Sequence, residues 1–303
     1  MGYLHFLAVF AAMAPLTQCH YTFVRIKANG EWQEPMRYIR NLTSPFDEKQ
    51  LVDSNMIWRE WNWPTYTLDF PDSVRCGRGN LDHANATEVL TVKAGDTVEI
   101  AQQRSPPHDW THDMFYGCPD DRGTCDPRPG YKQDFNHPGP LIVHLSKVPD
   151  GQDIHTYDGS GNWIKIHSRG LGSLADERPL KWELFTDVPP HLTFKIPPQT
   201  PAGQYLMRMD VVMSGVVTEW TKPGDLGILA QFYPSCAQLN ILSNATTTTT
   251  LPKGVAIPEI FAPDRPGMTT SYEMYHFRTL DENYTYPGGP VWTGERLVED
   301  KPN

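Results

Sequence analysis

Short segments in which apolar and polar residues alternate recur along the chain, and such segments are typical of β-strands that bury one face. The clearest of them span residues 21–27, 97–100, 141–145, 163–166, 191–196, 205–212 and 238–242. Turn-forming pairs such as Asn29-Gly30 and Asp158-Gly159 lie between them. Regularly spaced short strands with glycine and proline turns predict an all-β, immunoglobulin-like or fibronectin-like antiparallel β-sandwich with long loops and short helices.

Three stretches lack this alternation and predict loops or a tail. Residues 43–75 are rich in tryptophan, and residues 104–136 are rich in proline, aspartate and histidine, so both predict long loops. A threonine run at 246–250 begins a proline-rich tail with many aromatic residues. We expect this tail, about 244–303, to pack along the sandwich. Because no internal repeat is present, residues 20–303 are predicted to form a single domain.

The chain begins with an apolar, uncharged run at residues 4–14, which is too short to span a bilayer and has the length of a signal-peptide core. An earlier small-residue cleavage site would leave Pro15 after the cut, which is unfavourable. We therefore predict cleavage after Cys19, which makes residues 1–19 a signal peptide and His20 the mature N-terminus. The mature protein is then expected to be secreted and extracellular, without a membrane span.

Composition and charge exclude several classes of function. The chain contains 26 basic and 36 acidic residues, a net charge of −10, so it lacks the basic character that nucleic acids or anionic membranes would require. The 28 prolines and 23 glycines leave little room for long helices. Helical bundles and coiled coils are therefore poor fits.

The cysteines predict disulfides once the leader and Cys19 are removed. Cys118 and Cys125 are close in sequence and are expected to staple one loop, which leaves Cys76 to pair with Cys236. A structural zinc site is the alternative, although a secreted acidic chain favours disulfides. Sequons for N-glycosylation occur at Asn41, Asn85, Asn244 and Asn283.

An N-terminal histidine is a distinctive metal ligand. The α-amine and the ring nitrogen of His20 can chelate one ion, and one further imidazole completes a set of three nitrogens. Such a set favours copper, which stands at the top of the divalent affinity order. Because the chain contains 11 histidines, the position of His20 alone does not distinguish a ligand from an ordinary polar residue.

Six motifs occur one after another along the chain, and the first of them begins at His20. They are HYTFVRI (20–26), NHPGPLIVHL (136–145), PAGQYLMRMD (201–210), AQFYPSCAQLNI (230–241), GVAIPEIFAPDRPGM (254–268) and NYTYPGGPVW (283–292). Together they resemble the lytic polysaccharide monooxygenases of auxiliary activity family nine, formerly glycoside hydrolase family 61. The resemblance covers nearly the whole mature chain. It implies that Cys76–Cys236 is the long-range disulfide of that family.

The resemblance also implies roles for individual residues. His20 and His137 would be the two histidines of a copper brace, and Tyr233 would lie axial to the metal. Gln231 would be a donor near the oxygen site, and Tyr284 would be an aromatic residue on a flat substrate face. Each has a simpler alternative: His137 as a loop histidine, Gln231 and Tyr233 as alternating polar and core residues of a strand, and Tyr284 as a packing residue.

One part of the resemblance fails. In the family, the segment that matches Arg208-Met209-Asp210 has glutamate in place of Asp210, and a histidine that donates a hydrogen bond to the oxidant follows within a few residues. Here that histidine position falls on Ser214 or Gly215. The sequence thus predicts an intact metal site with an altered outer shell. Other residues that could take over the missing role are His144, His167, Glu219 and Asp225.

The sequence therefore predicts a copper-dependent monooxygenase that cleaves a β-linked polysaccharide, such as cellulose or hemicellulose, by oxidation at C1 or C4. A small-molecule or protein reductant must supply electrons from outside, since no flavin or haem motif is visible, and the protein is expected to be a monomer. The alternative is a copper-binding or cell-wall-binding protein that keeps the brace without efficient catalysis. A metal-free carbohydrate-binding sandwich is a weaker hypothesis, and no motif nominates the carboxylate pair of a glycoside hydrolase.

Overall fold

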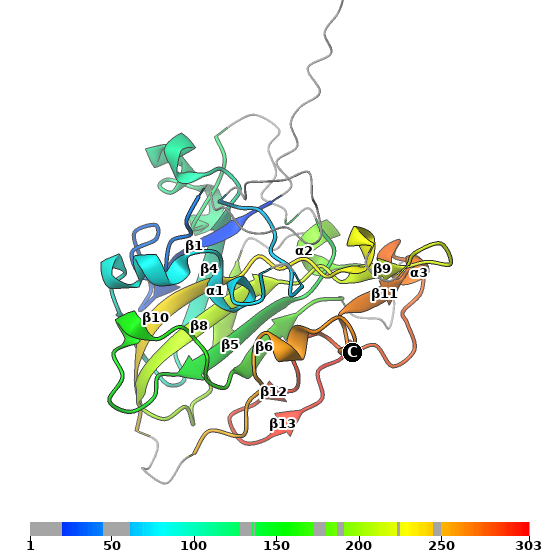
Figure 1. Cartoon of the computed structure of the whole chain (residues 1–303). Helices are drawn as coiled ribbons and strands as arrows, with labels where there is room; N and C mark the ends of the chain where they lie inside the picture. The colour runs from blue at the N-terminus through cyan, green and yellow to red at the C-terminus, as the bar shows by residue number, and fades with distance from the viewer. Residues whose placement is uncertain are drawn as a thin grey trace, which may run out of the picture.

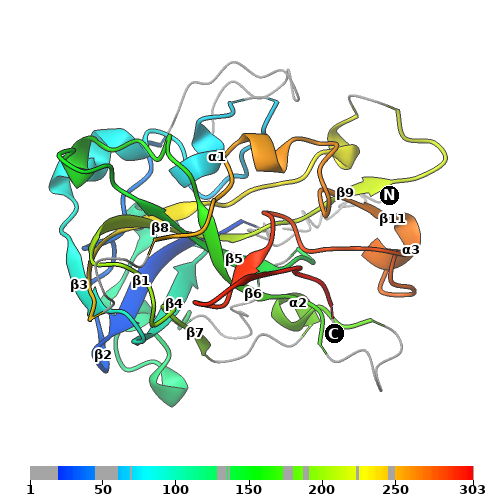
Figure 2. The ribbon, with the colours of Figure 1, turned by 90° about the horizontal axis from the view of Figure 1, so that it is seen from below.

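The structure, a computed structural model, describes nearly all of the predicted mature chain: residues 20–44, 61–68, 70–127, 135, 137–172, 180–186, 191–222, 225–244 and 250–302. The predicted leader, and with it the cleavage site, lies outside the described residues. Two β-sheets stack as layers, as Figures 1 and 2 show from two directions. None of the helices within the described residues is long and apolar enough to cross a bilayer.

The smaller sheet is antiparallel throughout, in the order β2-β1-β4-β7. Its strands are β1 (Thr22–Ala28), β2 (Glu31–Trp32), β4 (Thr97–Gln103) and β7 (Leu192–Lys195). The turn between β1 and β2 is Asn29-Gly30, and both residues have positive φ values of 55° and 82°. A two-residue turn of this kind matches the twist of the paired strands, which is why Asn-Gly is a strong hairpin signal.

The larger sheet has the order β13-β12-β6-β5-β8-β10-β3. Its strands are β3 (Leu90–Lys93), β5 (Leu141–Lys147), β6 (Ile164–Arg169), β8 (Gly203–Val211), β10 (Ser235–Leu242), β12 (Val291–Trp292) and β13 (Leu297–Val298). The central pairs are antiparallel, and β3 and β12 pair in parallel with β10 and β6.

Short elements complete the fold. A separate parallel pair is formed by β9 (Gly215–Val217) and β11 (Thr269–Ser271). The helices are α1 (Ser73–Cys76), α2 (Glu183–Thr186) and α3 (Tyr272–Tyr275). The predicted all-β, immunoglobulin-like sandwich with long loops and short helices is confirmed.

The central strand β8 is buried on both faces. Met207 and Met209 face the core between the two sheets, whereas Leu206 contributes to a second cluster on the outer face. Phe261, from the tail, belongs to that outer cluster. Because both faces of the strand are covered, its residues from Tyr205 to Val211 are all buried rather than alternating with solvent.

The tail lies along the larger sheet, and a buried ion pair anchors its end. The Lys165 ammonium group donates to Asp300 Oδ2 at 2.6 Å and to the Pro287 carbonyl at 2.8 Å. Ser168 Oγ donates to the second carboxylate oxygen of Asp300, also at 2.6 Å. Lys165 is 1% exposed, so its charge depends on these partners. They therefore tie the last residues of the chain to β6.

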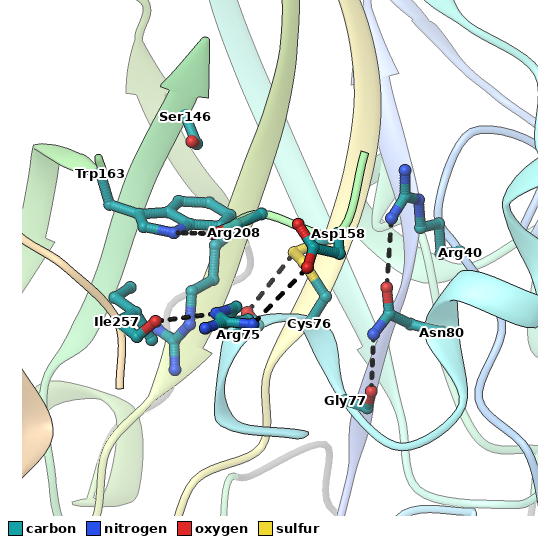
Figure 3. Close-up of a disulfide and its surroundings, with 12 residues drawn as sticks. Arg40, Arg75, Cys76, Gly77, Asn80, Ser146, Asp158, Trp163, Arg208 and Ile257 are labelled. Atoms are coloured by element: carbon teal, nitrogen blue, oxygen red, sulfur yellow. Dashed lines mark hydrogen bonds and ion pairs between the residues drawn. A yellow bond between two sulfur atoms is a disulfide. The ribbon is translucent and has the colours of Figure 1, made fainter. Parts of the chain in front are cut away.

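Both predicted disulfides are present. Cys76 at the end of α1 is bonded to Cys236 in β10, with their Cα atoms 5.1 Å apart, and the Cα atoms of Cys118 and Cys125 are 5.6 Å apart. All four cysteines of the predicted mature chain are thus used, and the alternative of a zinc site is wrong. Figure 3 shows the first disulfide beside Arg75, which donates to the Ile257 carbonyl at 2.8 Å.

The four sequons differ in exposure. Asn85, Asn244 and Asn283 are exposed, whereas Asn41 is half-buried. The Asn41 side-chain oxygen accepts hydrogen bonds from Leu42 N and Trp61 Nε1, both at 2.8 Å. Glycan occupancy at each site stays a prediction.

We expect the two disulfides to contribute unequally to stability. The Cys76–Cys236 bond joins residues 160 positions apart, whereas Cys118 and Cys125 are only 7 apart. In the chain-entropy model, replacing both cysteines by alanine should lower the free energy of unfolding by about 5 kcal/mol for the first pair and about 2 kcal/mol for the second. Denaturant titration of the two double variants measures this order, and equal losses would contradict it.

Candidate metal centre

Two histidines and one tyrosine from distant parts of the chain meet at one end of the sandwich. The ring centroids of His20 and His137 are 6.1 Å apart, and Tyr233 lies 5.8 Å from the first and 6.1 Å from the second. His20 directly precedes β1, His137 lies in the loop before β5, and Tyr233 precedes β10. The structure therefore brings together the three residues that the sequence nominated as metal ligands.

Strand β8 holds this cluster in place. The Tyr233 backbone N–H donates to Asp210 Oδ1 at 2.8 Å, and Asp210 is fully buried in an ion pair with Arg208. The Tyr21 hydroxyl donates to the Val211 carbonyl and accepts from Val211 N, at 3.1 and 3.0 Å. Its ring also stacks on that of Tyr233 at 4.7 Å. Tyr21, the residue next to His20, and Tyr233 are thus fixed to the same strand.

The loop that carries His137 approaches β8 too closely for any other residue at Gly139. A Cβ atom at this position would lie 2.1 Å from the Val212 carbonyl oxygen, which is a backbone atom that cannot give way. Val212 N donates to the Pro140 carbonyl at 3.1 Å, and His137 N donates to the Phe135 carbonyl at 2.7 Å. This is the physical reason for the H-x-G-P motif, because the glycine lets the loop dock onto the strand.

Both imidazoles are held in the neutral form. Burial lowers the pKa of His20 to about 4, assisted by the nearby His137, Arg104 and Arg78. Burial likewise lowers the pKa of His137 to about 4, with Arg104 as the second cause. A neutral imidazole offers a lone pair to a metal ion, so the rings are ready ligands at neutral pH.

The donor atoms of the cluster fit a metal ion with a preference for nitrogen. The Nε2 atom of His137 is buried and has no hydrogen-bond partner among the described residues, although buried polar atoms are normally paired. The described residues contain no group of three histidine, cysteine or acidic side chains that could hold a metal. The set is instead two imidazoles, a phenol and the amine that cleavage before His20 would release, and such nitrogen ligands suit copper.

Gln231 lies beside Tyr233, and its role as a donor near the oxygen site stays a prediction. The Tyr233 hydroxyl donates to Gln231 Oε1 at 2.8 Å, which leaves the phenol oxygen with lone pairs for another partner. Gln231 also exchanges both backbone hydrogen bonds with Met213, at 2.9 and 3.1 Å. Side chains directly opposite each other in an antiparallel pair share a face, so Met213 lies on the same face as Gln231.

The structure distinguishes between the positions at which the histidine of the family was expected. A Cβ atom at Gly215 would lie 2.0 Å from the Ile228 carbonyl oxygen, so this position cannot carry a side chain. Ser214 is only 5% exposed, and its hydroxyl donates to the Gly267 carbonyl at 2.7 Å, so its side chain points toward the tail. Of these neighbouring positions, Met213 is the one that faces Gln231.

The other proposed donors lie in different surroundings. His144 is fully buried and contacts the Gly288 carbonyl through Nε2 at 2.9 Å, while the ring of His167 stacks on Phe194 at 5.4 Å. Glu219 and Asp225 are exposed loop residues. None of these contacts connects them to the two histidines.

Tyr284 lies in a buried cluster. Only 7% of it is exposed, and its ring packs against Trp182 at 6.3 Å and Tyr286 at 5.9 Å. Stacking on a sugar ring needs an exposed face, which this position does not offer. The substrate-binding role of Tyr284 stays a prediction, and the packing alternative describes its present contacts.

Three residues near the cluster were not nominated from the sequence. The Trp63 ring lies 5.5 Å from that of His20, and Asn62 Nδ2 donates to the His20 carbonyl at 3.3 Å and to the Arg104 carbonyl at 2.7 Å. Arg104 is the charged group that affects the pKa of both histidines. The abundance of tryptophan in residues 43–75 was the sequence feature that could have indicated Trp63, but it did not show which tryptophan lies near His20.

Known proteins of similar sequence identify the family to which the chain belongs. Residues 20–284 match the family model described as "Auxiliary Activity family 9 (formerly GH61)", and the chain therefore belongs to auxiliary activity family 9. The chain is 28% identical over 295 residues to AA9 family lytic polysaccharide monooxygenase G of Aspergillus tamarii, covering 95% of this chain and 70% of the relative. It is 25% identical over 286 residues to monooxygenase C of Emericella nidulans, covering 94% and 96%.

Solved structures show the same fold. The protein titled CvAA9A superposes with a TM-score of 0.57 at 21% identity, covering 91% of this chain and all of the other. The extended catalytic domain of H. jecorina LPMO9A gives a TM-score of 0.55 at 19% identity, covering 94% and 96%.

We expect one Cu(II) ion to bind through the two histidines. His20→Ala and His137→Ala should each weaken binding greatly, because each removes a nitrogen ligand, whereas Tyr233→Phe should keep the metal, since an axial phenol is at most a weak ligand. Isothermal titration calorimetry of the mature protein measures this, with His108→Ala, whose side chain is 77% exposed, as the matched control. Unchanged affinity in both ligand variants would reject the site.

Proposed function

We propose that the protein is a secreted copper-dependent monooxygenase that cleaves a β-linked polysaccharide. The main observation behind the proposal is that His20 and His137 lie close together beside Tyr233 in a member of auxiliary activity family 9. The buried His137 Nε2 atom has no hydrogen-bond partner among the described residues. When bound, copper would supply the redox chemistry by which oxygen or hydrogen peroxide oxidises the sugar at C1 or C4.

The residues of the chain supply geometry and electrostatics. His20 and His137 would hold the ion through neutral nitrogens, since their low pKa values keep both rings unprotonated at neutral pH. Tyr233 would lie beside the bound ion, and Gln231 fixes the Tyr233 hydroxyl by accepting its hydrogen bond. Tyr233 is only 3% exposed, and its contacts with Asp210 and Tyr21 keep these side chains in one arrangement, which is what a metal centre needs from its protein.

The proposal includes partners outside the chain. Cellulose or hemicellulose is the proposed substrate, and a small molecule or a second protein is the proposed electron donor. We propose an extracellular monomer, with the signal peptide removed before His20.

The site also supports a second candidate function. Met213 lies on the same face as Gln231, and its thioether is not a hydrogen-bond donor. Gly215 cannot accept a side chain that would supply one. Loss of one donor that acts in the transition state typically costs about 10²–10³-fold in rate. A protein that binds copper or the cell wall without efficient turnover is therefore the alternative.

The first test is the N-terminus of the secreted protein. We expect mass spectrometry to find His20 as the first residue, because only then is its α-amine free to bind metal. The copper content of the same sample should be one ion per chain. A mature protein that begins at Pro15 would exclude the brace and with it the proposed reaction.

The second test introduces a hydrogen-bond donor on the face that Met213 shares with Gln231. Met213→His should increase oxidative cleavage of cellulose, by up to about 10²-fold, while copper affinity stays the same, since Met213 is not a ligand. Ser214→His is the control for a histidine at a neighbouring position, because the Ser214 side chain is directed to the Gly267 carbonyl. Product analysis with a reductant present measures both variants.

The outcomes of this test separate the two candidates. No cleavage of cellulose or hemicellulose by the wild type or either variant, with copper still bound tightly, would favour the copper-binding alternative. Rapid cleavage by the wild type that neither variant changes would show that the missing donor is not limiting.

A further inference from the structure

A tryptophan on the loop after β9 is exposed to an unusual degree. Trp220 is 76% exposed, whereas the other large hydrophobic side chains that are exposed in the described residues reach at most 47%. Figures 1 and 2 both show this loop extending outward from the sheets, on the side that carries α3. An indole ring contributes a large apolar area, so its exposure suggests a binding role.

The backbone around Trp220 is fixed by a hydrogen-bonded turn. Thr218 Oγ1 accepts from Trp220 N and Thr221 N, both at 3.2 Å. Thr221 Oγ1 accepts from Thr218 N at 3.0 Å and donates to the Thr218 carbonyl at 2.9 Å. Both threonine hydroxyls are thus used to define the turn. The exposed indole is therefore presented by an ordered segment, which lowers the entropic cost of binding a ligand.

Two further exposed apolar side chains belong to the same region. Val217 is 47% exposed at the end of β9 and pairs with Ser271 of β11, and Tyr272, the next residue along the chain, is 43% exposed. The Tyr272 ring is held by His276 at 4.1 Å and by the Arg278 guanidinium at 5.7 Å. We name Val217, Trp220 and Tyr272 the Trp220 platform.

The Trp220 platform is connected to the metal centre by a short piece of chain. Met213, which pairs with Gln231 beside Tyr233, is seven residues before Trp220. Even fully extended, seven residues span at most about 25 Å. A polysaccharide of a few sugar rings can cover this distance, so one chain can touch both places.

We infer that the Trp220 platform binds the sugar rings of a neutral polysaccharide chain that extends from the metal centre. The inference rests on the proposed function. The apolar C–H face of a pyranose ring packs on an indole. Glu219, next to Trp220 in the chain, and the ion pair of Glu273 with Arg278 beside Tyr272 are exposed and can bind hydroxyl groups. Because these charges are of both signs, the surroundings favour a neutral ligand over an acidic one.

A protein partner fits the Trp220 platform less well. Aromatic side chains bury about 150–250 Å² each, so three side chains of this size fall short of the about 800 Å² per partner that stable interfaces bury. A sugar chain needs only one ring face at each contact. The small, isolated platform therefore suits a carbohydrate.

Binding of copper-free mature protein to polysaccharide tests the inference without any need for turnover. Depletion of the protein from solution by microcrystalline cellulose, and separately by insoluble xylan, gives an apparent affinity. We expect Trp220→Ala to weaken it about tenfold on the polysaccharide that binds, and Trp220→Phe to recover part of the loss because it keeps a ring. Leu242→Ala is the matched control, since Leu242 is 47% exposed at the far end of β10.

Each result decides the question. Equal binding of the wild type and Trp220→Ala, or no binding of the wild type to either polysaccharide, overturns the inference. So does a wild-type dimer in sedimentation velocity that Trp220→Ala dissociates, because a second copy would then occupy the Trp220 platform. Copper titration of the same variants reports on the metal centre separately, and we expect Trp220→Ala to bind copper like the wild type.

Discussion

The buried ion pair between Arg208 and Asp210 is the constraint on which the site depends. Both side chains are fully buried in the central strand β8, so each needs the other to offset its desolvation. The guanidinium also donates to the Val74 carbonyl at 3.0 Å and lies 4.8 Å from the Phe261 ring of the tail. The carboxylate accepts the backbone N–H of Tyr233. One pair thus joins α1, the tail and the metal centre, and Figure 3 shows Arg208 near Cys76.

This arrangement explains why the metal ligands can come from three distant segments and still meet. Val211, the last residue of β8, fixes the hydroxyl of Tyr21 next to His20, and Val212, the residue after the strand, bonds to the loop that carries His137. Two neighbouring residues at the end of β8 therefore position both histidines. A strand that is buried on both faces moves little, which suits a site whose ligands must keep one geometry. Substitution within β8 should therefore affect stability and metal affinity together.

The sequence predicted the main strands, and the reasons for its failures are local. Alternating segments become strands wherever one face is buried. The ordered motifs led us to propose His20, His137 and Tyr233 as metal ligands, and the structure places their rings close together. Strands of two or three residues, such as β9 and β12, carry no periodic signal because tertiary contacts alone decide their pairing. The burial of Tyr284 and the exposure of Trp220 were likewise unpredictable, since both lie in segments without a hydrophobic period.

The segment from Gly215 to Leu229 links the two unusual features of the molecule. Its backbone at Ile228 fills the space that a side chain at Gly215 would need, and its outer turn presents Trp220 to solvent. The absence of a side chain at Gly215 and the exposure of Trp220 therefore occur in the same segment of the chain. In an enzyme, the first lowers the rate of the chemical step, while the second lengthens the residence of a polymer on the surface. Slow turnover on a tightly held substrate is the behaviour that this combination favours.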